Sequence, residues 1–436
     1  RITEDGLSCM PARKLRDGFL QTLHTGVTTL QLRFSGSDDA IIIGTLGRQR
    51  SAKQPSSSCN YWATYYGGHD SNDMPNSIRY RDGIIAIVGE EQGMDFPVTA
   101  GAFQSINTGD PDVIVLKFDE FGKRLWATLY GGRYMDNAQY GKHCVDIDGN
   151  GNIDICGVTT SPNFPVTIDP YHGGPTHLLT DGFIVQLNKD GARNWATCVG
   201  AYQWDIFVAI RTDAAGNVFC SGHTWCSDFP VTTNGFQQVF GGDDSDGMAV
   251  KYSSTGTLLW STFLGGSGED EQTTLRVTSG GDAVLLGWTR STNYPITANA
   301  FQTSMLSTTE PTITVIASNG QLLWSTYCHD SSATGYNDLE VDANGDFLIS
   351  YTGKTSIGAS LFSCLRVRKV SQTNGPLWIR SILGGGQSPF IALDVSGRIT
   401  LAGYASGPLD VPPGHFNDQF NDLYVIRLEA DGRPVW

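Results

Sequence analysis

A phrase built around one Trp recurs along this chain and constrains its fold more than any other feature. Its clearest copy is GTLLWSTFLGG, residues 256–266, in which an alternating apolar and polar run follows a turn glycine and ends in a Gly pair. Related phrases surround seven Trp residues that are 54 to 69 residues apart: Trp62, Trp126, Trp195, Trp260, Trp324, Trp378 and Trp436. A long period that repeats this often is the signature of a repeat architecture.

Each repeat reads as four short β-strands. It opens with an alternating strand, a tight turn and a second strand that ends in glycine, as in CVDIDGNGNIDICG, residues 144–157. This pattern is typical of a β-hairpin. A third strand, such as DGFIVQL at 181–187, and a second turn then lead to the Trp strand. Seven such repeats predict an all-β fold, a single seven-bladed β-propeller of four-stranded antiparallel blades, with the Trp side chains packed between blades rather than forming a binding platform.

We expect one closed domain rather than several. Residues 1–26 precede the first clear repeat and are assigned to an N-terminal cap, which reads equally well as a short helix or as a strand. The propeller would span residues 27–436. Its expected blades are residues 27–68, 69–132, 133–200, 201–266, 267–328, 329–386 and 387–436. The first should be the least regular, because only 18 residues separate Gly44 from Trp62.

Several repeats carry an insertion between their second and third strands. The copies are DFPVTAGAFQ (95–104), NFPVT (163–167), DFPVTTNGFQ (228–237) and NYPITANAFQ (293–302). Together with the Trp phrase, they resemble the bacterial seven-bladed β-propeller repeat family found in large secreted and cell-surface proteins. The resemblance extends from about residue 28 onward and is closest in the second to fifth repeats. It implies a propeller fold and an extracellular setting, but the family has no common catalytic residues to transfer.

The charge balance excludes two classes of partner. With 29 Lys and Arg against 44 Asp and Glu, the net charge is −15. Nucleic acid and anionic membranes both attract a basic surface, so neither is expected as a partner. No apolar run approaches the length of a membrane-spanning helix, and no Asn-x-Ser/Thr glycosylation site occurs. We therefore expect an extracellular or cell-surface protein of bacterial type whose partner is a protein (another copy or a neighbouring surface component) or an extracellular glycan.

The segment DIDGNGNID, residues 146–154, is the strongest candidate for a metal site. It resembles the calcium loop between two strands of integrin α-type propeller blades, and its first half resembles an EF-hand loop. If Gly151 is the positive-φ residue of a three-residue hairpin loop, Asp146 lies opposite Asp154. Facing carboxylates destabilise a strand pair unless a cation neutralises them. Calcium could bind the oxygens of Asp146, Asp148, Asn150 and Asp154. The alternative is a plain solvated hairpin, as expected for TDAAGNVF at 212–219.

The chain has nine cysteines, so at least one thiol has no partner within it. The same hairpin register places Cys144 opposite Cys156, close enough to form a disulfide. Cys9 and Cys59 are the next most favourable pair, since both lie in the irregular N-terminal region.

Aspartates also recur in register with the repeat. One set follows the Gly pairs and another precedes the third strand: Asp136, Asp205 and Asp270, and Asp112, Asp181, Asp246 and Asp422. We expect them to tie blades together by accepting hydrogen bonds from backbone N–H groups. The functional alternative is a ring of carboxylates at one mouth of the propeller channel.

No catalytic set is visible. The eight His are scattered, and none lies in a metalloprotease or nucleophile-elbow motif. We therefore predict a non-catalytic structural or interaction propeller that self-associates into a surface assembly or fibre, with calcium as its one candidate cofactor. The alternative is a glycan-binding module, or a carbohydrate-active enzyme with its site at the propeller axis. Exposed aromatic residues on one rim, together with converging carboxylates, would favour that alternative.

Overall fold

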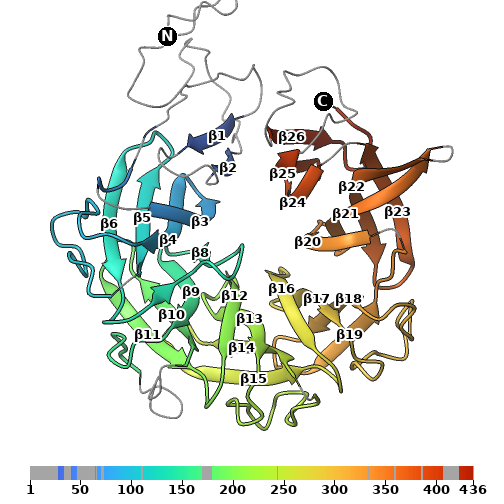
Figure 1. Ribbon diagram of the computed structural model, residues 1–436, viewed down its shortest axis with the longest axis horizontal. Helices are drawn as coiled ribbons and strands as arrows, with labels where there is room; N and C mark the ends of the chain where they lie inside the picture. The colour runs from blue at the N-terminus through green and yellow to red at the C-terminus, as the bar shows by residue number, and fades with distance from the viewer. Residues whose placement is uncertain are drawn as a thin grey trace, which may run out of the picture.

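The computed structural model is a ring of β-sheets around a central axis (Figure 1). It is an all-β, six-bladed β-propeller whose antiparallel blades are mostly four-stranded. The structure describes residues 28–33, 41–46, 64, 66–69, 73–109, 111–168, 179–242, 244–331, 333–357, 360–383, 386–405 and 422–435. These residues form strands, turns and loops without any helix, and so without a helix that could cross a membrane.

The expectation of seven blades is wrong. The second to seventh repeats form the six blades, whereas the described part of the first repeat is a separate two-stranded sheet of β1 (Thr28–Arg33) and β2 (Ile41–Leu46). This hairpin lies beside the first blade, where β2 contacts β3. The short spacing between Gly44 and Trp62 leaves little chain for two further strands of ordinary length. The expected N-terminal cap, Cys9 and Cys59 lie outside the described residues.

The blades follow one another around the ring in chain order. Blade 1 comprises β3 (Asp73–Arg81), β4 (Ile84–Glu91), β5 (Asp112–Asp119) and β6 (Arg124–Tyr130). Blade 2 comprises β7 (Asp136–Asn137), β8 (Val145–Ile147), β9 (Ile153–Thr159), β10 (Asp181–Leu187) and β11 (Arg193–Val199). Blade 3 comprises β12 (Asp205–Thr212), β13 (Val218–Thr224), β14 (Asp246–Tyr252) and β15 (Leu258–Leu264). Blade 4 comprises β16 (Asp270–Val277), β17 (Ala283–Thr289), β18 (Glu310–Ile316) and β19 (Leu322–Tyr327). Blade 5 comprises β20 (Ala333–Val341), β21 (Phe347–Ile357), β22 (Ser360–Ser371) and β23 (Gly375–Leu383). Blade 6 comprises β24 (Gly386–Leu393), β25 (Ile399–Ala405) and β26 (Asp422–Leu428).

The first strand of each blade lies toward the axis, and the Trp strands β6, β11, β15, β19 and β23 lie on the outside (Figure 1).

The predicted hairpin register is confirmed in blade 2. Gly151 has a φ of 78°, a conformation that a residue without Cβ adopts freely. The N–H of Asp148 donates to the carbonyl of Asn152 at 3.0 Å, and Asp146 pairs with Asp154 across β8 and β9. The sequence of the turn therefore determines which side chains of this blade face each other.

The Trp side chains pack between blades, as predicted. Trp260 is 1 % exposed, and its indole N–H donates to the carbonyl of Ser318 in the next blade at 3.1 Å. Its ring lies against the turn glycine Gly320, where a Cβ would come within 2.9 Å of the indole. Trp126 makes the same contacts two junctions earlier, with the carbonyl of Lys189 and with Gly191. Trp126 and Trp260 thus each join the outer strand of one blade to the last turn of the next.

The Phe-Pro-Val-Thr insertions cover the outer strands. In blade 1 the hydroxyl of Thr99 accepts the N–H of Ala127 at 3.1 Å, and the N–H of Thr99 donates to the carbonyl of Ala127 at 3.0 Å. Thr232 bonds Ser261 of β15 in the same way. An uncovered outer strand would present unpaired N–H and C=O groups to other chains. The insertions therefore protect much of the outer edge in the four blades that carry them.

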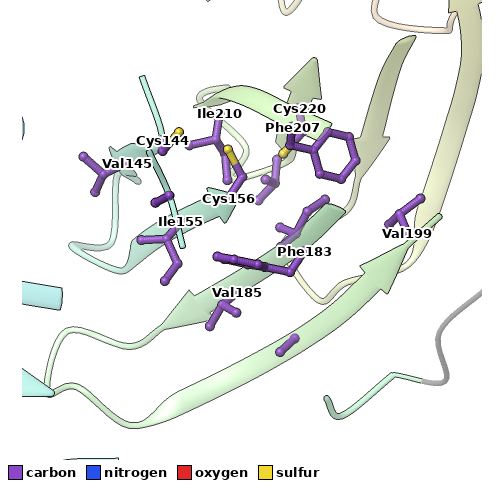
Figure 2. Close-up of a cluster of buried hydrophobic side chains, with 14 of the residues drawn as sticks. Cys144, Val145, Ile155, Cys156, Phe183, Val185, Val199, Phe207, Ile210 and Cys220 are labelled. Atoms are coloured by element: carbon purple, nitrogen blue, oxygen red, sulfur yellow. The ribbon is translucent and has the colours of Figure 1, made fainter. Parts of the chain in front are cut away.

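Three cysteines contribute to the core between blades 2 and 3. Figure 2 shows Cys144, Cys156 and Cys220 beside Phe207 and Ile210. All seven cysteines among the described residues are buried free thiols. The neighbouring Cys156 thiol and burial hold the pKa of Cys144 well above its usual range. These thiols therefore act as small apolar groups that fill the core.

We expect Cys144 and Cys156 to form a disulfide when the folded protein is oxidised. The N–H of Cys156 donates to the carbonyl of Cys144 at 3.1 Å, so the two form a hydrogen-bonded cross-strand pair. Such pairs have Cα atoms about 5.5 Å apart, within the range that a disulfide needs. Peptide mapping under non-reducing conditions after mild oxidation should recover the linked peptides. Free thiols at both positions would contradict the prediction.

Candidate functional site

The innermost strands carry a ring of charged residues around the axis. Equivalent positions are occupied by Arg79 on β3, Asp146 on β8, Arg211 on β12, Arg276 on β16 and Glu340 on β20. Asp146, Arg211 and Arg276 are buried, although charged side chains are seldom buried without a partner. The axis is therefore one place where this propeller buries charge.

Asp146 links three blades. Its Oδ1 lies 2.8 Å from Nε of Arg79 in blade 1, and its Oδ2 accepts hydrogen bonds from the N–H and hydroxyl of Thr212 in blade 3 at 2.8 and 2.9 Å. Burial would raise the pKa of Asp146, but Arg79 and Arg211 hold it below its usual range. Asp146 is thus an ionised carboxylate used for inter-blade contacts.

On the opposite side of the axis, Arg276 of blade 4 binds two carboxylates of blade 5. Its Nη2 lies 2.9 Å from Oδ1 of Asp338, and its Nε lies 3.0 Å from Oε1 of Glu340. Asp338 also accepts the N–H of Ile391 in blade 6 at 3.1 Å. Burial would raise the pKa of Asp338, but His143 and Arg276 hold it well below its usual range. This pairing joins blades 4, 5 and 6.

The loop between β7 and β8 reaches across the axis to this cluster. Nε2 of His143 lies 2.8 Å from Oδ1 of Asp338, which is 195 residues away in the chain. The carbonyl of His143 accepts the N–H of Ile210 in blade 3 at 2.9 Å, and the N–H of Cys144 donates to the hydroxyl of Ser77 in blade 1 at 3.0 Å. Residues 138–144, which we call the axial loop, thus connect blade 2 to blades 1, 3 and 5. Four of the five axial charges, all except Arg211, form an ion pair with a side chain of a neighbouring blade.

Acid should weaken the axial contacts through His143. Burial lowers the pKa of His143 to about 3. The charge of Asp338 opposes this shift, whereas Arg276 and Arg211 add to it. Below pH 6.5, His143 is protonated in the unfolded chain but stays neutral in the folded protein. The free energy of unfolding therefore falls as the pH falls. At pH 5 this cost is about 2 kcal/mol. The stability loss between pH 7 and pH 5, measured by urea unfolding, should be about 2 kcal/mol smaller for His143→Gln. Equal losses in both proteins would contradict this account.

The four predicted calcium ligands lie on one hairpin but contact separate partners. Asp148 caps the turn, accepting the N–H groups of Asn150 and Asn152 at 2.8 Å. Asp154 accepts a hydrogen bond from Nε2 of Gln186 at 2.9 Å, and burial raises its pKa well above the usual range. Asp146 is directed to Arg79 and Thr212, as described above. No group of three or more His, Cys, Asp or Glu side chains within the described ranges is arranged to hold a metal. This geometry favours the plain hairpin, and calcium at this hairpin stays a prediction.

The prediction that the recurring aspartates tie blades together through backbone N–H groups is confirmed only for the set at the start of blades. Asp136 at the start of blade 2 accepts the N–H of Gly132 at 2.6 Å, and Asp270 at the start of blade 4 accepts the N–H of Gly266 at 2.7 Å. Asp112 and Asp246 accept the N–H groups of Thr108 and Gly241 within their own blades.

These carboxylates are also unusually buried. Burial raises the pKa of Asp112 to about 6, and it raises the pKa of Asp136 and of Asp246 to about 7. The recurring spacing of these aspartates was visible in the sequence, but their burial was not.

Aromatic residues are exposed on one rim, in the connection from blade 2 to blade 3. Tyr202 is 66 % and Trp204 is 53 % exposed. The ring of Trp204 meets that of Trp225 edge-on at 5.9 Å, and Trp225 meets His223 at 5.0 Å. No sequence pattern indicated that Trp204, Trp225 and His223 would lie together.

Apart from Asp146, which was assigned to a calcium loop, the axial charges were also missed by sequence analysis. Each of these charges occupies the same position in the first hairpin of its repeat, for example the Arg of LRV or the Glu of LEV. A charged residue at this recurring position was the sequence signal that could have revealed them. His143 and Asp338 gave no such signal, because only the folded ring brings them together.

No protein-family model and no curated protein matches this sequence. Solved structures that it resembles include the polysaccharide lyase Uly1, at 10 % identity and a TM-score of 0.35, covering 82 % of this chain and 88 % of the lyase. A variant of the apocarotenoid oxygenase of Synechocystis has 11 % identity and a TM-score of 0.36, covering 84 % and 89 %. A protein of unknown function from Bacteroides caccae has 11 % identity and a TM-score of 0.28, covering 58 % and 88 %. Similarity this low carries no information about activity, so the chain is assigned to the β-propeller fold and to no family.

Proposed function

We propose that this protein is a non-catalytic interaction module that works by contact with a partner. The observation that carries the proposal is the pairing of the buried charges at the axis. There Asp146, Asp338 and Arg276 are buried and paired, and the axial loop lies across them. A catalytic acid, base or nucleophile must reach its substrate, and these groups are occupied in holding blades together.

The repeat phrases support a setting outside the cell. They resemble those of bacterial secreted and cell-surface propellers, and we propose that this chain belongs among them with six blades instead of seven. The net charge of −15 suits a protein that avoids anionic surfaces.

The outer wall supports contact with another protein, either a second copy or a neighbouring surface component. The residue before the Trp is an exposed leucine in four of the outer strands: Leu125, Leu259, Leu323 and Leu377, with 40, 40, 50 and 42 % exposure. Single exposed apolar residues are common on protein surfaces, so it is the recurrence of leucine at one position of four blades that supports an interface. Such contacts can propagate into a fibre when their rotation does not close a ring.

Two measurements test this proposal. Light scattering over a concentration series and electron microscopy should reveal assembly that weakens in a Leu259→Asp, Leu323→Asp variant. A panel of extracellular polysaccharides should show no cleavage. A protein that stays monomeric and cleaves a polysaccharide, with the activity lost in Asp338→Asn, would overturn the proposal.

A glycan-binding module is the second candidate, and the exposed aromatic rim favours it. The ring of Trp204 offers a flat apolar face of the kind that sugar rings stack against. Binding to a glycan array that is lost in Trp204→Ala, while the folded state is retained, would support this candidate.

A further inference from the structure

Four buried aspartates at two blade junctions, like Asp205 at the junction of blades 2 and 3, share one hydrogen-bonding pattern. Their Oδ2 atoms accept hydrogen bonds, whereas their Oδ1 atoms have no hydrogen-bond partner in the described part of the chain. Each of the four residues is 0 % exposed. They are Asp112 and Asp136 at the junction of blades 1 and 2, and Asp246 and Asp270 at the junction of blades 3 and 4.

The two carboxylates of each junction approach the same glycine. A Cβ at Gly131 would lie closer than 3.0 Å to Oδ1 of Asp112 and to Oδ2 of Asp136. A Cβ at Gly265 would lie equally close to Oδ1 of Asp246 and Oδ2 of Asp270. Two negative groups therefore meet at one buried point in both junctions.

Backbone carbonyl oxygens complete the arrangement. At the second junction, a Cβ at Gly242 would lie 2.9 Å from the oxygen of Gly268, 3.1 Å from that of Gly266 and 3.3 Å from Oδ1 of Asp246. At the first junction, a Cβ at Gly109 would lie closer than 3.0 Å to the oxygens of Gly132 and Tyr134 and to Oδ1 of Asp112. The repeat thus places two carboxylates and two carbonyl oxygens together twice.

This arrangement needs a positive charge that the chain does not supply. None of the four carboxylates takes part in an ion pair among the described residues. Hydrogen bonds to Oδ2, such as those from Gln104 Nε2 to Asp112 at 2.6 Å and from Ser291 Oγ to Asp270 at 2.7 Å, favour the ionised form and hold Oδ1 in a fixed direction, although burial outweighs them and raises the pKa of both aspartates. Hydrogen bonds that orient a ligand's second oxygen are the usual support of a metal-binding carboxylate.

We propose that each of these two blade junctions binds one calcium ion. At the first, the ligands are the carboxylates of Asp112 and Asp136 and the carbonyl oxygens of Gly132 and Tyr134. At the second, they are Asp246, Asp270 and the carbonyls of Gly266 and Gly268. Calcium suits a site made only of oxygen atoms with two negative charges, and water can complete its flexible coordination. The sites are separate from the hairpin at 146–154.

The test is calcium binding by the full chain after metal has been removed by chelation. Isothermal titration with CaCl2 should detect these sites, and calcium should raise the melting temperature by several degrees over EDTA, because a ligand that binds only the folded state stabilises it. Asp112→Asn and Asp246→Asn should each remove one bound equivalent and part of the melting-temperature gain. Both variants should fold, since the amide oxygen can still accept the hydrogen bonds now made to Oδ2.

The matched control is Asp146→Asn, which should leave the calcium stoichiometry unchanged. Loss of binding in that variant alone would place calcium at the hairpin and overturn the proposal. Absence of any calcium effect in the wild-type chain, with Asp112→Asn and Asp246→Asn more stable than wild type in EDTA, would also overturn it. That result would show that the junction carboxylates are held as neutral acids.

Discussion

Replacing Asp338 by alanine is expected to destabilise the folded protein by about 3–5 kcal/mol. The side chain is 1 % exposed and contacts Arg276 at 2.9 Å, His143 at 2.8 Å and the N–H of Ile391 at 3.1 Å. Its removal leaves the buried Arg276 with one carboxylate fewer and frees the axial loop from blade 5. Urea unfolding at pH 7 measures the loss.

A matched control for this experiment lies on the surface. Asp190 pairs with Lys189 at 3.0 Å, but both side chains are largely exposed. Because water screens such a pair, Asp190→Ala should cost less than about 1 kcal/mol. Similar losses at Asp338 and Asp190 would show that the axial ion pairs do not hold the ring together.

Trp260→Ala should cost about 3–5 kcal/mol, a second large effect. The indole is 1 % exposed, donates to the carbonyl of Ser318 and packs against the turn glycine of the next blade. Alanine would leave a cavity between blades 3 and 4 and an unpaired carbonyl. Thermal unfolding followed by circular dichroism reports the change.

Trp204→Ala is the control for Trp260→Ala, because Trp204 is 53 % exposed on the rim. Its removal should change stability by no more than about 0.5 kcal/mol. If both variants lose stability to the same extent, the repeated Trp is not the inter-blade contact described here.

The local elements of this fold could be predicted from sequence because each depends on residues close in the chain. The turn at Gly151 sets the pairing of Asp146 with Asp154, and the Trp phrase marks the outer strands. Side-chain alternation has a period of two residues, so a short segment suffices to define a strand and its buried face.

The number of blades could not be predicted by counting repeats. The first repeat carries the hairpin pattern and a Trp, yet its described part is the two-stranded sheet of β1 and β2 beside blade 1. Closure depends on how many complete sheets fit around the axis. The last blade has three strands, with Pro434 only bridging to Leu428 beyond β26.

The candidate sites also divide into features that the sequence predicts and features that depend on the tertiary structure. The sequence by itself determined the strands, the hairpin register, the Trp contacts between blades and the aspartates that accept backbone N–H groups, since each follows from a pattern that every repeat restates. Only the tertiary structure decided that the ring has six blades, that His143 meets Asp338 across 195 residues, and that carboxylates of successive blades converge at Gly131 and Gly265. The physical reason is that these contacts join residues whose separation in the chain carries no periodic signal, and they form only when the blades pack around the axis.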